Sequence, residues 1–147
     1  MSAEPTGPAP AADGATRMPP IVTPDAVAFW AAADREEFIG QQCGDCGRFT
    51  FPPRPMCPHC HSLKREDVRL SGRGTVVSYT IPRHPHPFGF KTTPIVAVIE
   101  LEEGTRLVSN VVGIAPEAVK MDMAVEVTFE PTMKDHKVPV FRPRSAP

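Results

Sequence analysis

Four cysteines in two C-x-x-C pairs constrain the fold of this chain more than any other feature of its sequence. Cys43 and Cys46 form the first pair, Cys57 and Cys60 form the second, and ten residues lie between the pairs. Two residues between cysteines let one tight turn direct both sulfurs to one ion. Structural zinc takes four such ligands in a tetrahedron and leaves no open position for water. The spacing therefore predicts a zinc ribbon with one structural zinc ion.

Disulfides, redox chemistry and histidine ligation are the alternatives to this zinc site. The first twenty residues have no apolar run, so we expect no secretory signal, no bilayer-spanning stretch and a cytoplasmic location. A reducing compartment favours metal over disulfides. Two pairs ten residues apart also fit a shared ion better than a thioredoxin-like exchange site. His59 and His61 flank the second pair, but the set of four cysteines is complete without them, which favours a surface position for both.

The residues around the cysteines support a compact ribbon. Gly47 follows the first pair, where a positive φ is often needed. His61 stands at the equivalent position after the second pair, where many ribbons have glycine, so the second turn is expected to differ slightly. Four thiolates on one zinc ion have a formal charge of −2, and four nearby cations are candidates to offset it: Arg48, Arg54, Lys64 and Arg65.

The rest of the chain divides into segments of different composition. Residues 1–22 are rich in Pro, Ala and Gly, which predicts a disordered tail. Residues 23–42 are expected to form an N-terminal helix and a lead-in strand, residues 43–67 the zinc ribbon, and residues 68–147 a β-barrel domain. The fold class predicted is mainly β.

A short helix is predicted from Pro24 to about Arg35, because Thr23-Pro24-Asp25 is a typical helix start. Val27, Trp30 and Ala31 should share one face, with Phe29 off it. Phe29 and Trp30 together have more apolar surface than one small contact needs. The helix is therefore expected either to dock onto its own domain or to contribute to a subunit interface.

Beyond the cysteines the pattern becomes typical of strands. Ser71-Gly72-Arg73-Gly74 indicates a turn, Glu103-Gly104 a hairpin connection, and Ala115–Val119 one helical turn. Five short segments rich in β-branched residues indicate a small closed or nearly closed barrel. These segments are Thr75–Ile81, Ile95–Leu101, Arg106–Val112, Ala124–Phe129 and Val138–Phe141.

The loop from Arg83 to Lys91 is the most unusual segment that could contact a ligand or a partner. Arg83 and Lys91 are candidates to pair with CoA phosphates, and Phe88 and Phe90 are candidates to cover an acyl chain or fill a partner's pocket. The alternative is a variable surface loop whose geometry is set by its prolines. His84 and His86 could act as an acid/base pair, but no carboxylate stands near them in the sequence, which favours solvated side chains.

No complete catalytic set is present in the sequence. There is no nucleophile elbow and no phosphate-binding loop, and the zinc site would use every thiol. Nucleic-acid binding is an alternative function for a ribbon and a small barrel, but residues 68–147 have ten bases and eight acids, a net charge of only +2. A stand-alone hydrolase or redox protein is a further alternative.

The order of these segments resembles a known family. Phe29-Trp30 is followed by CGDCGRFTFPPRPMCPHC, SGRGTVVSYT, PIVAVIELEEGTRLVSNVVG and VEVTFEP, and the series ends in Val138-Pro139-Val140-Phe141. Over residues 24–143 the chain is similar to the zinc-ribbon plus OB-fold proteins of the domain of unknown function 35 (DUF35) family. The resemblance implies a rubredoxin-like zinc ribbon followed by a five-stranded OB-fold barrel.

The resemblance also implies a function as an accessory subunit of an acyl-CoA-processing complex. Members of the family stand beside thiolase-like proteins, thiolase-fold aldolases or hot-dog-fold hydratases, in lipid, sterol or aromatic degradation or in isoprenoid synthesis. The partner usually has the catalytic residues, and the small subunit completes the complex or shapes the acyl-CoA site. No catalytic residue is therefore assigned to this chain, and Phe29, Trp30 and the 83–91 loop are expected to contact the partner or CoA.

Overall fold

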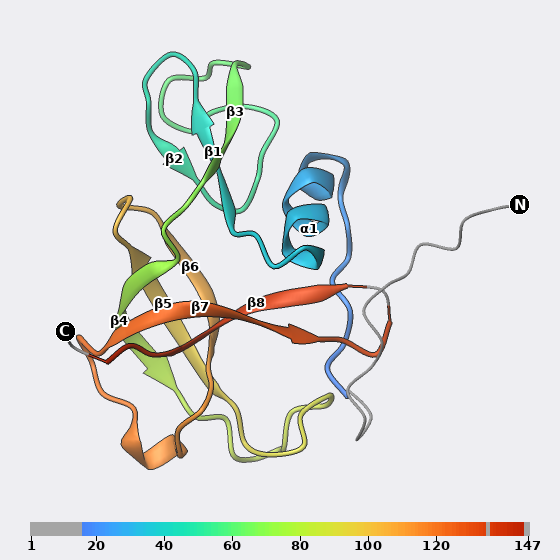
Figure 1. Cartoon of the computed structure of the whole chain (residues 1–147), viewed down its shortest axis with the longest axis vertical. Helices are drawn as coiled ribbons and strands as arrows, with labels where there is room; N and C mark the ends of the chain where they lie inside the picture. The colour runs from blue at the N-terminus through green and yellow to red at the C-terminus, as the bar shows by residue number, and fades with distance from the viewer. Residues whose placement is uncertain (1–15, 135, 146–147) are drawn as a thin grey trace, which may run out of the picture.

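The computed structural model describes residues 16–134 and 136–145, which form a small three-stranded sheet above a β-barrel, with one helix beside them (Figure 1). A 3-10 turn, η1 (Pro24–Ala26), leads into the helix α1 (Val27–Asp34). The upper sheet contains β1 (Ile39–Cys43), β2 (Phe49–Thr50) and β3 (Arg65–Arg69). The barrel contains β4 (Arg73–Thr80), β5 (Ile95–Leu101), β6 (Arg106–Val111), β7 (Ala124–Pro131) and β8 (Lys137–Pro143), with a second 3-10 turn, η2 (Pro116–Ala118), before β7.

The upper sheet is the scaffold of the predicted zinc ribbon. Its strand order is β2-β1-β3, and β1 pairs antiparallel with both neighbours. The sequence does not indicate β3, because the segment Arg65–Arg69 reads REDVR and lacks an alternating apolar pattern. In the structure most of its residues are exposed. The strand forms through backbone hydrogen bonds with β1, in a register that places Ile39 opposite Arg69 and Cys43 opposite Arg65. Paired strands thus flank the cysteine turns, with β1 before them and β3 after them.

The barrel confirms the predicted fold class. Its five strands close in the order β4-β5-β6-β8-β7, and β6 and β8 form the one parallel pair that the described residues show. β5 alternates strictly between buried and half-buried residues, which is the period-2 pattern of a strand with one face toward a core. The predicted hairpin at Glu103-Gly104 and the predicted turn within Ala115–Val119 are both present. β4 begins at Arg73, inside the segment predicted to be a turn.

Helix α1 docks onto the chain's own core, which is one of the two roles expected for it. Phe29 is 4% exposed, whereas Val27 is 55% exposed. The Phe29 ring contacts the edges of the Phe38 and Phe51 rings, with centroids 6.3 and 5.4 Å away. Phe29, which was placed off the face of Val27, is therefore the aromatic residue that docks the helix; the sequence did not indicate this because the eight-residue helix is apolar on nearly every side.

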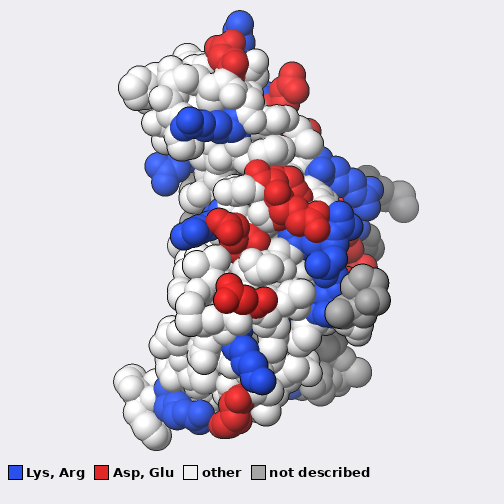
Figure 2. Space-filling model, turned by 90° about the vertical axis from the view of Figure 1, so that its left-hand side faces the viewer, with Lys and Arg blue, Asp and Glu red and all other residues white. Residues whose placement is uncertain are grey.

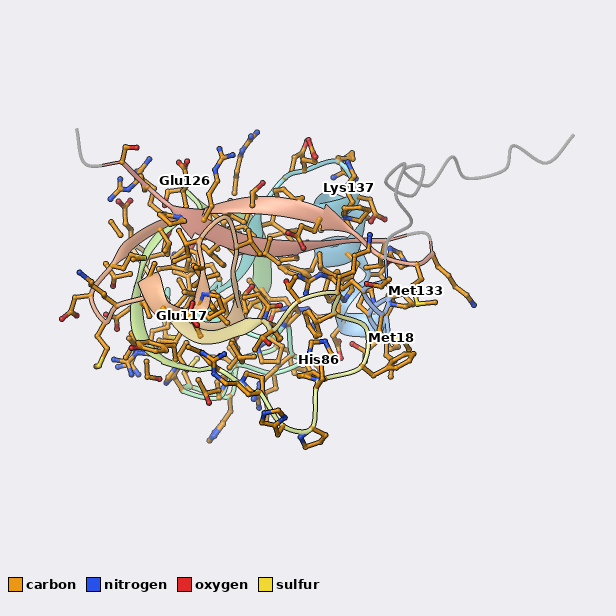
Figure 3. The ribbon with its side chains drawn as sticks, turned by 90° about the horizontal axis from the view of Figure 1, so that it is seen from below. Met18, His86, Glu117, Glu126, Met133 and Lys137 are labelled. Atoms are coloured by element: carbon orange, nitrogen blue, oxygen red, sulfur yellow. The ribbon has the colours of Figure 1, made fainter. Side chains whose placement is uncertain are left out.

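Residues 16–22, predicted to belong to a disordered tail, cross the barrel as an ordered segment that we call the strap. Residues 1–15 of the predicted tail lie outside the described residues. The strap is attached by the backbone N–H of Met133, which donates to the carbonyl of Arg17, and by the hydroxyl of Thr16, which donates to the carbonyl of Gly89. Viewed from below, Met18 and Met133 lie at the same end of the barrel (Figure 3).

Helix α1 is the longest helix in the described part of the chain, and its eight residues are too few to cross a lipid bilayer.

Candidate functional site

The four cysteines lie on two turns of nearly identical geometry. The N–H of Cys43 donates to the carbonyl of Arg48, and the N–H of Cys57 donates to the carbonyl of Ser62, each over 2.9 Å. Gly47 has a φ of 74°, as predicted, and His61 has a φ of 63°. The second turn therefore does not differ in the expected way, because His61 adopts the left-handed conformation that glycine adopts in the first, at a cost of about 1 kcal/mol for a residue with a Cβ atom.

The four sulfurs lie at the separations that one zinc ion requires. The Sγ atoms of Cys43 and Cys60 are 3.5 Å apart, those of Cys46 and Cys57 are 3.7 Å apart, and all four lie within 4.8 Å of one another. A tetrahedron with Zn–S bonds of about 2.3 Å has S–S edges of about 3.8 Å. In residues 16–134 and 136–145, these cysteines form the one group of three or more potential ligands close enough to share an ion. Cys43, Cys46, Cys57 and Cys60 thus fit a structural zinc ion that would hold the two turns together.

The backbone prepares two of these thiols for metal binding. N–H groups of Cys46 and Asp45 donate to the Cys43 sulfur and lower the pKa of that thiol to about 6. Hydrogen bonds from the N–H groups of Cys60 and His59 lower the pKa of Cys57 in the same way. The N–H of Ser62 lowers the pKa of Cys60, but hydrogen bonds with neighbouring thiols, Cys43 first, outweigh it and raise that pKa to about 12. Zinc binding would require all four sulfurs as thiolates, so it would release any protons that the thiols hold.

The cations near the cysteines are engaged with other side chains or with the backbone. Arg48 hydrogen-bonds to His59, which turns the His59 ring toward Arg48. Lys64 lies 3.5 Å from Asp45, and Arg65 contacts Asp25 at 3.0 Å on the approach to α1. These contacts connect the metal turns to β3 and to the helix entry. Arg65 therefore links the ribbon to the N-terminal segment as well as reducing the local negative charge.

The 83–91 loop is held by a contact with η2 and by a contact within the loop. Arg83 forms an ion pair with Glu117 at 3.0 Å, and the His86 ring bonds to the carbonyl of Phe90 at 2.8 Å. The His86 ring is thus oriented by a backbone carbonyl rather than by a carboxylate. Phe88 is 81% exposed and projects from the loop. Phe90, in contrast, turns back beneath the strap, where the Arg17 guanidinium lies 4.9 Å from its ring centroid.

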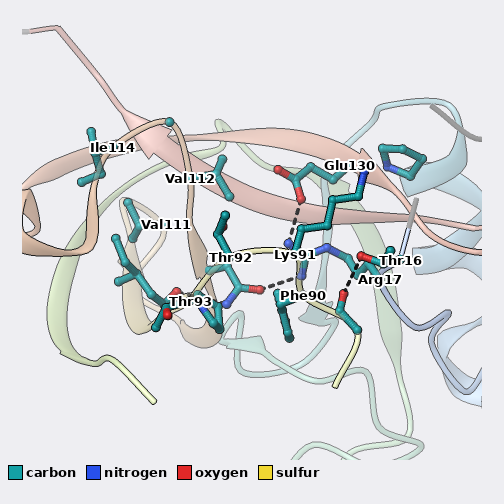
Figure 4. Close-up of a pocket in the computed structure, with 16 residues that line it drawn as sticks. Thr16, Arg17, Phe90, Lys91, Thr92, Thr93, Val111, Val112, Ile114 and Glu130 are labelled. Atoms are coloured by element: carbon teal, nitrogen blue, oxygen red, sulfur yellow. Dashed lines mark hydrogen bonds and ion pairs between the residues drawn. The ribbon is translucent and has the colours of Figure 1, made fainter. Parts of the chain in front are cut away.

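Arg17 anchors the strap between two cavities. Its guanidinium donates to the side-chain oxygen of Asn110 and to the carboxylate of Glu130, each over 2.7 Å (Figure 4). One cavity, of about 480 Å³, lies beneath the loop and includes Lys91 and Thr93 in its lining. The other, of about 620 Å³, opens toward α1. Arg17 contributes to both, and sequence analysis missed it because its partners lie 93 and 113 residues further along the chain.

Charges of both signs are interspersed on the barrel surface (Figure 2). Arginines of the barrel strands pair with acids on or next to neighbouring strands: Arg73 with Glu102, Arg106 with Glu100 and Arg142 with Glu126. A phosphate backbone would have to displace these carboxylates to reach the arginines, so this face does not favour the nucleic-acid alternative.

The ribbon of paired C-x-x-C turns and the closed five-stranded barrel define the class of this protein as a zinc-ribbon plus OB-fold protein. Two family profiles match it, described as the ChsH2 rubredoxin-like zinc ribbon domain over residues 30–64 and the ChsH2 C-terminal OB-fold domain over residues 67–130. The chain is 36% identical over 104 residues to a DUF35 domain-containing scaffold protein of Methanocaldococcus jannaschii, a match that covers 69% of this chain and 74% of that protein. The chain belongs to the DUF35 family.

Two further similarities concern a hydratase subunit and an aldolase. A probable enoyl-CoA hydratase alpha subunit of Thermomonospora curvata is 38% identical over 129 residues, which are 88% of this chain and 40% of that protein. The chain thus spans less than half the length of this relative. A solved structure described as the Ltp2-ChsH2(DUF35) aldolase has a chain that is 38% identical, with a TM-score of 0.79 over 85% of this chain and 98% of that one.

Proposed function

We propose that this chain is the accessory zinc-ribbon and OB-fold subunit of an acyl-CoA-processing complex, in which a partner subunit has the catalytic residues. The similarity to the aldolase chain carries this proposal, because it extends over 98% of that chain, ribbon and barrel together. The chemistry of the described residues is consistent with a supporting role. The four thiols form one ligand cluster, and the partner of the His86 ring is a backbone carbonyl rather than a carboxylate.

The proposed partner is a thiolase-fold aldolase or another thiolase-like subunit. The aldolase chain is matched along almost its whole length, whereas the hydratase alpha subunit is matched along only 40%. A hydratase partner is the second candidate, favoured by the name of that relative alone. In either complex, the zinc ion would stabilise the ribbon and hold its surface in shape for the partner, and it would have no open position for substrate.

The test is co-purification followed by an activity assay. A tagged chain is used to retain proteins from an extract of its native host, and the bound proteins are identified by mass spectrometry against a tag-only control. We expect a stoichiometric thiolase-fold or hydratase subunit, and we expect turnover of an acyl-CoA substrate by the reconstituted complex but not by the purified chain. Full activity of the purified chain alone, or retention of nucleic acid in place of an enzyme subunit, would contradict the proposal.

A further inference from the structure

An apolar groove lies between the strap, helix α1 and the barrel. Its walls come from the strap, α1, the loop at residues 51–53, the 83–91 loop, β6 and β8, and its volume is about 620 Å³. Arg17 is the one charged residue among those that line it. That charge is balanced by the carboxylate of Glu130, at 2.7 Å. The groove therefore has almost no net electrostatic preference.

The rim of the groove exposes large apolar side chains to water. Ile21 is 90% exposed, Phe88 is 81% exposed, Val108 is 67% exposed and Met18 is 53% exposed. Single exposed apolar residues are ordinary, but contiguous apolar patches on soluble proteins usually mark interaction sites. These four residues come from three separate segments of the chain and line one groove. The patch is therefore a property of the tertiary structure rather than of one apolar stretch of sequence.

Three polar side chains of the groove, those of Arg17, Ser109 and Asn110, have hydrogen-bond partners within the chain. The hydroxyl of Ser109 donates to the carbonyl of Pro139, and the amide of Asn110 donates to the carbonyl of Ile95 while its oxygen accepts from Arg17. An occupant would need to supply few hydrogen bonds. It would instead have to be apolar and uncharged, since a buried unpaired charge is costly.

Three occupants can be compared with these observations. Residues 1–15 of the chain contain no Ile, Leu, Val or aromatic residue, so they are poorly suited to cover an apolar groove. A small acyl ligand is usually enclosed by its site over most of its surface. The groove differs, because the side chains of Ile21 and Phe88 project outward from its rim. Side chains that project from the rim of a groove are typical of protein interfaces, where such side chains enter pockets of the partner. They therefore favour another protein as the occupant.

We propose that this groove is the docking site for an uncharged, apolar segment of the partner subunit. The proposal rests on the proposed function and adds the surface through which the complex forms. The contacts of Arg17 hold the strap in place before the partner arrives, so the groove is preformed and little ordering is needed on binding. Phe88 would enter the partner, while the partner's apolar segment would lie against Val108 and Trp30.

The test uses the complex retained by the wild-type chain and two charged substitutions on the rim. Val108→Glu and Ile21→Glu place a carboxylate in the interface at positions that are exposed in the free chain, so both variants should fold and bind zinc. We expect each to weaken partner binding by roughly thirtyfold or more, as measured by titration of the purified subunits. Met121→Glu is the matched control, because Met121 is 62% exposed but does not line the groove, and it should bind as the wild type does.

A second measurement identifies the occupant directly. A photo-reactive p-benzoylphenylalanine at position 108 should cross-link to a partner peptide that is apolar and free of charged side chains. Binding unaffected by both rim substitutions, or a cross-link to a second copy of this chain or to a lipid, would overturn the proposal while leaving the proposed function intact. Failure of the wild-type chain to retain any CoA-enzyme subunit would instead contradict the proposed function, and the docking proposal with it.

Discussion

Each thiol of the metal centre has its own environment, although the four cysteines belong to two similar turns. Cys43 and Cys57 are buried and accept backbone N–H groups, whereas Cys46 and Cys60 are exposed. A zinc ion needs all four as thiolates, so its binding would release any protons that the thiols hold. The site thus depends on each ligand individually, and removal of any one leaves three crowded sulfurs and an open coordination position.

Replacement of a ligand should remove the metal. Cys57→Ser and Cys60→Ser are expected to lose bound zinc and to unfold the ribbon, because metal binding supplies most of the folding free energy of so small a module. Metal content measured by mass spectrometry should fall from about one zinc ion per chain to nearly zero. His59→Ala is the control and should keep its zinc, since the His59 ring bonds to Arg48 instead. Full zinc content and an unchanged melting curve in Cys57→Ser would disprove the ligand assignment.

The strap depends on one arginine. Arg17→Ala would remove two hydrogen bonds to Asn110 and Glu130 and the contact with the Phe90 ring, and it would leave the Glu130 carboxylate without this partner. We expect a loss of about 1–3 kcal/mol in the free energy of unfolding, measured with urea. Arg142→Ala, which breaks an exposed pair with Glu126, should change the stability by less than about 1 kcal/mol. Equal effects of the two substitutions would show that the strap adds nothing to stability.

At the scale of elements, the barrel strands were predictable, whereas β3, the strap and the buried face of α1 were not. The barrel strands have the alternating apolar pattern of a sheet with one buried face, as β5 shows most clearly. β3 lacks this pattern, because its REDVR sequence gains its conformation from backbone pairing with β1 rather than from burial. The strap is held by long-range contacts of Thr16 and Arg17, which local sequence cannot reveal. Helix α1 was predictable as a helix. Which of its faces is buried was not predictable, because apolar residues lie on nearly every side of it.

The pairing of β4 with β5 makes Gly74 a position where any side chain is costly. A Cβ atom at Gly74 would lie 2.6 Å from the carbonyl oxygen of Glu100 and 2.9 Å from Cγ2 of Ile99. Gly74→Ala should therefore destabilise the barrel by about 2–3 kcal/mol, because the two strands would have to separate. Gly104→Ala is the matched control: Gly104 has a φ of 90° and open space around it, so only backbone strain of about 1 kcal/mol is expected. Equal losses in urea denaturation would show that close strand approach is not what requires glycine at position 74.

At the scale of the whole molecule, helix, ribbon and barrel share one apolar core. The ring of Phe38, which precedes β1, contacts both Phe29 on α1 and Phe141 on β8, with centroids 6.3 and 6.1 Å away. His136 and the N–H of Lys137 both bond to Asp34, which ties the end of the helix to the start of β8. The aromatic rings of the core thus connect the base of the ribbon to the barrel. The cysteine turns lie at the other end of the ribbon and are held by few apolar contacts.

This arrangement predicts how the molecule responds to loss of its metal. After chelation of zinc, amide hydrogen exchange should become fast in the cysteine turns, in β2 and in the distal part of β3, because these segments have little apolar burial of their own. Exchange in β5 should stay slow, since Val76, Ile99 and Val125 keep the barrel core intact without the metal. Exchange is measured by mass spectrometry on the zinc-bound and the chelated chain, with addition of zinc after chelation as the control for reversibility. If β5 loses its protection together with the turns, the shared aromatic core transmits the loss to the barrel, and ribbon and barrel fold as a single cooperative unit. If only the turns exchange faster, the zinc ion stabilises the end of the ribbon alone, and the apolar groove should keep its shape in the metal-free chain.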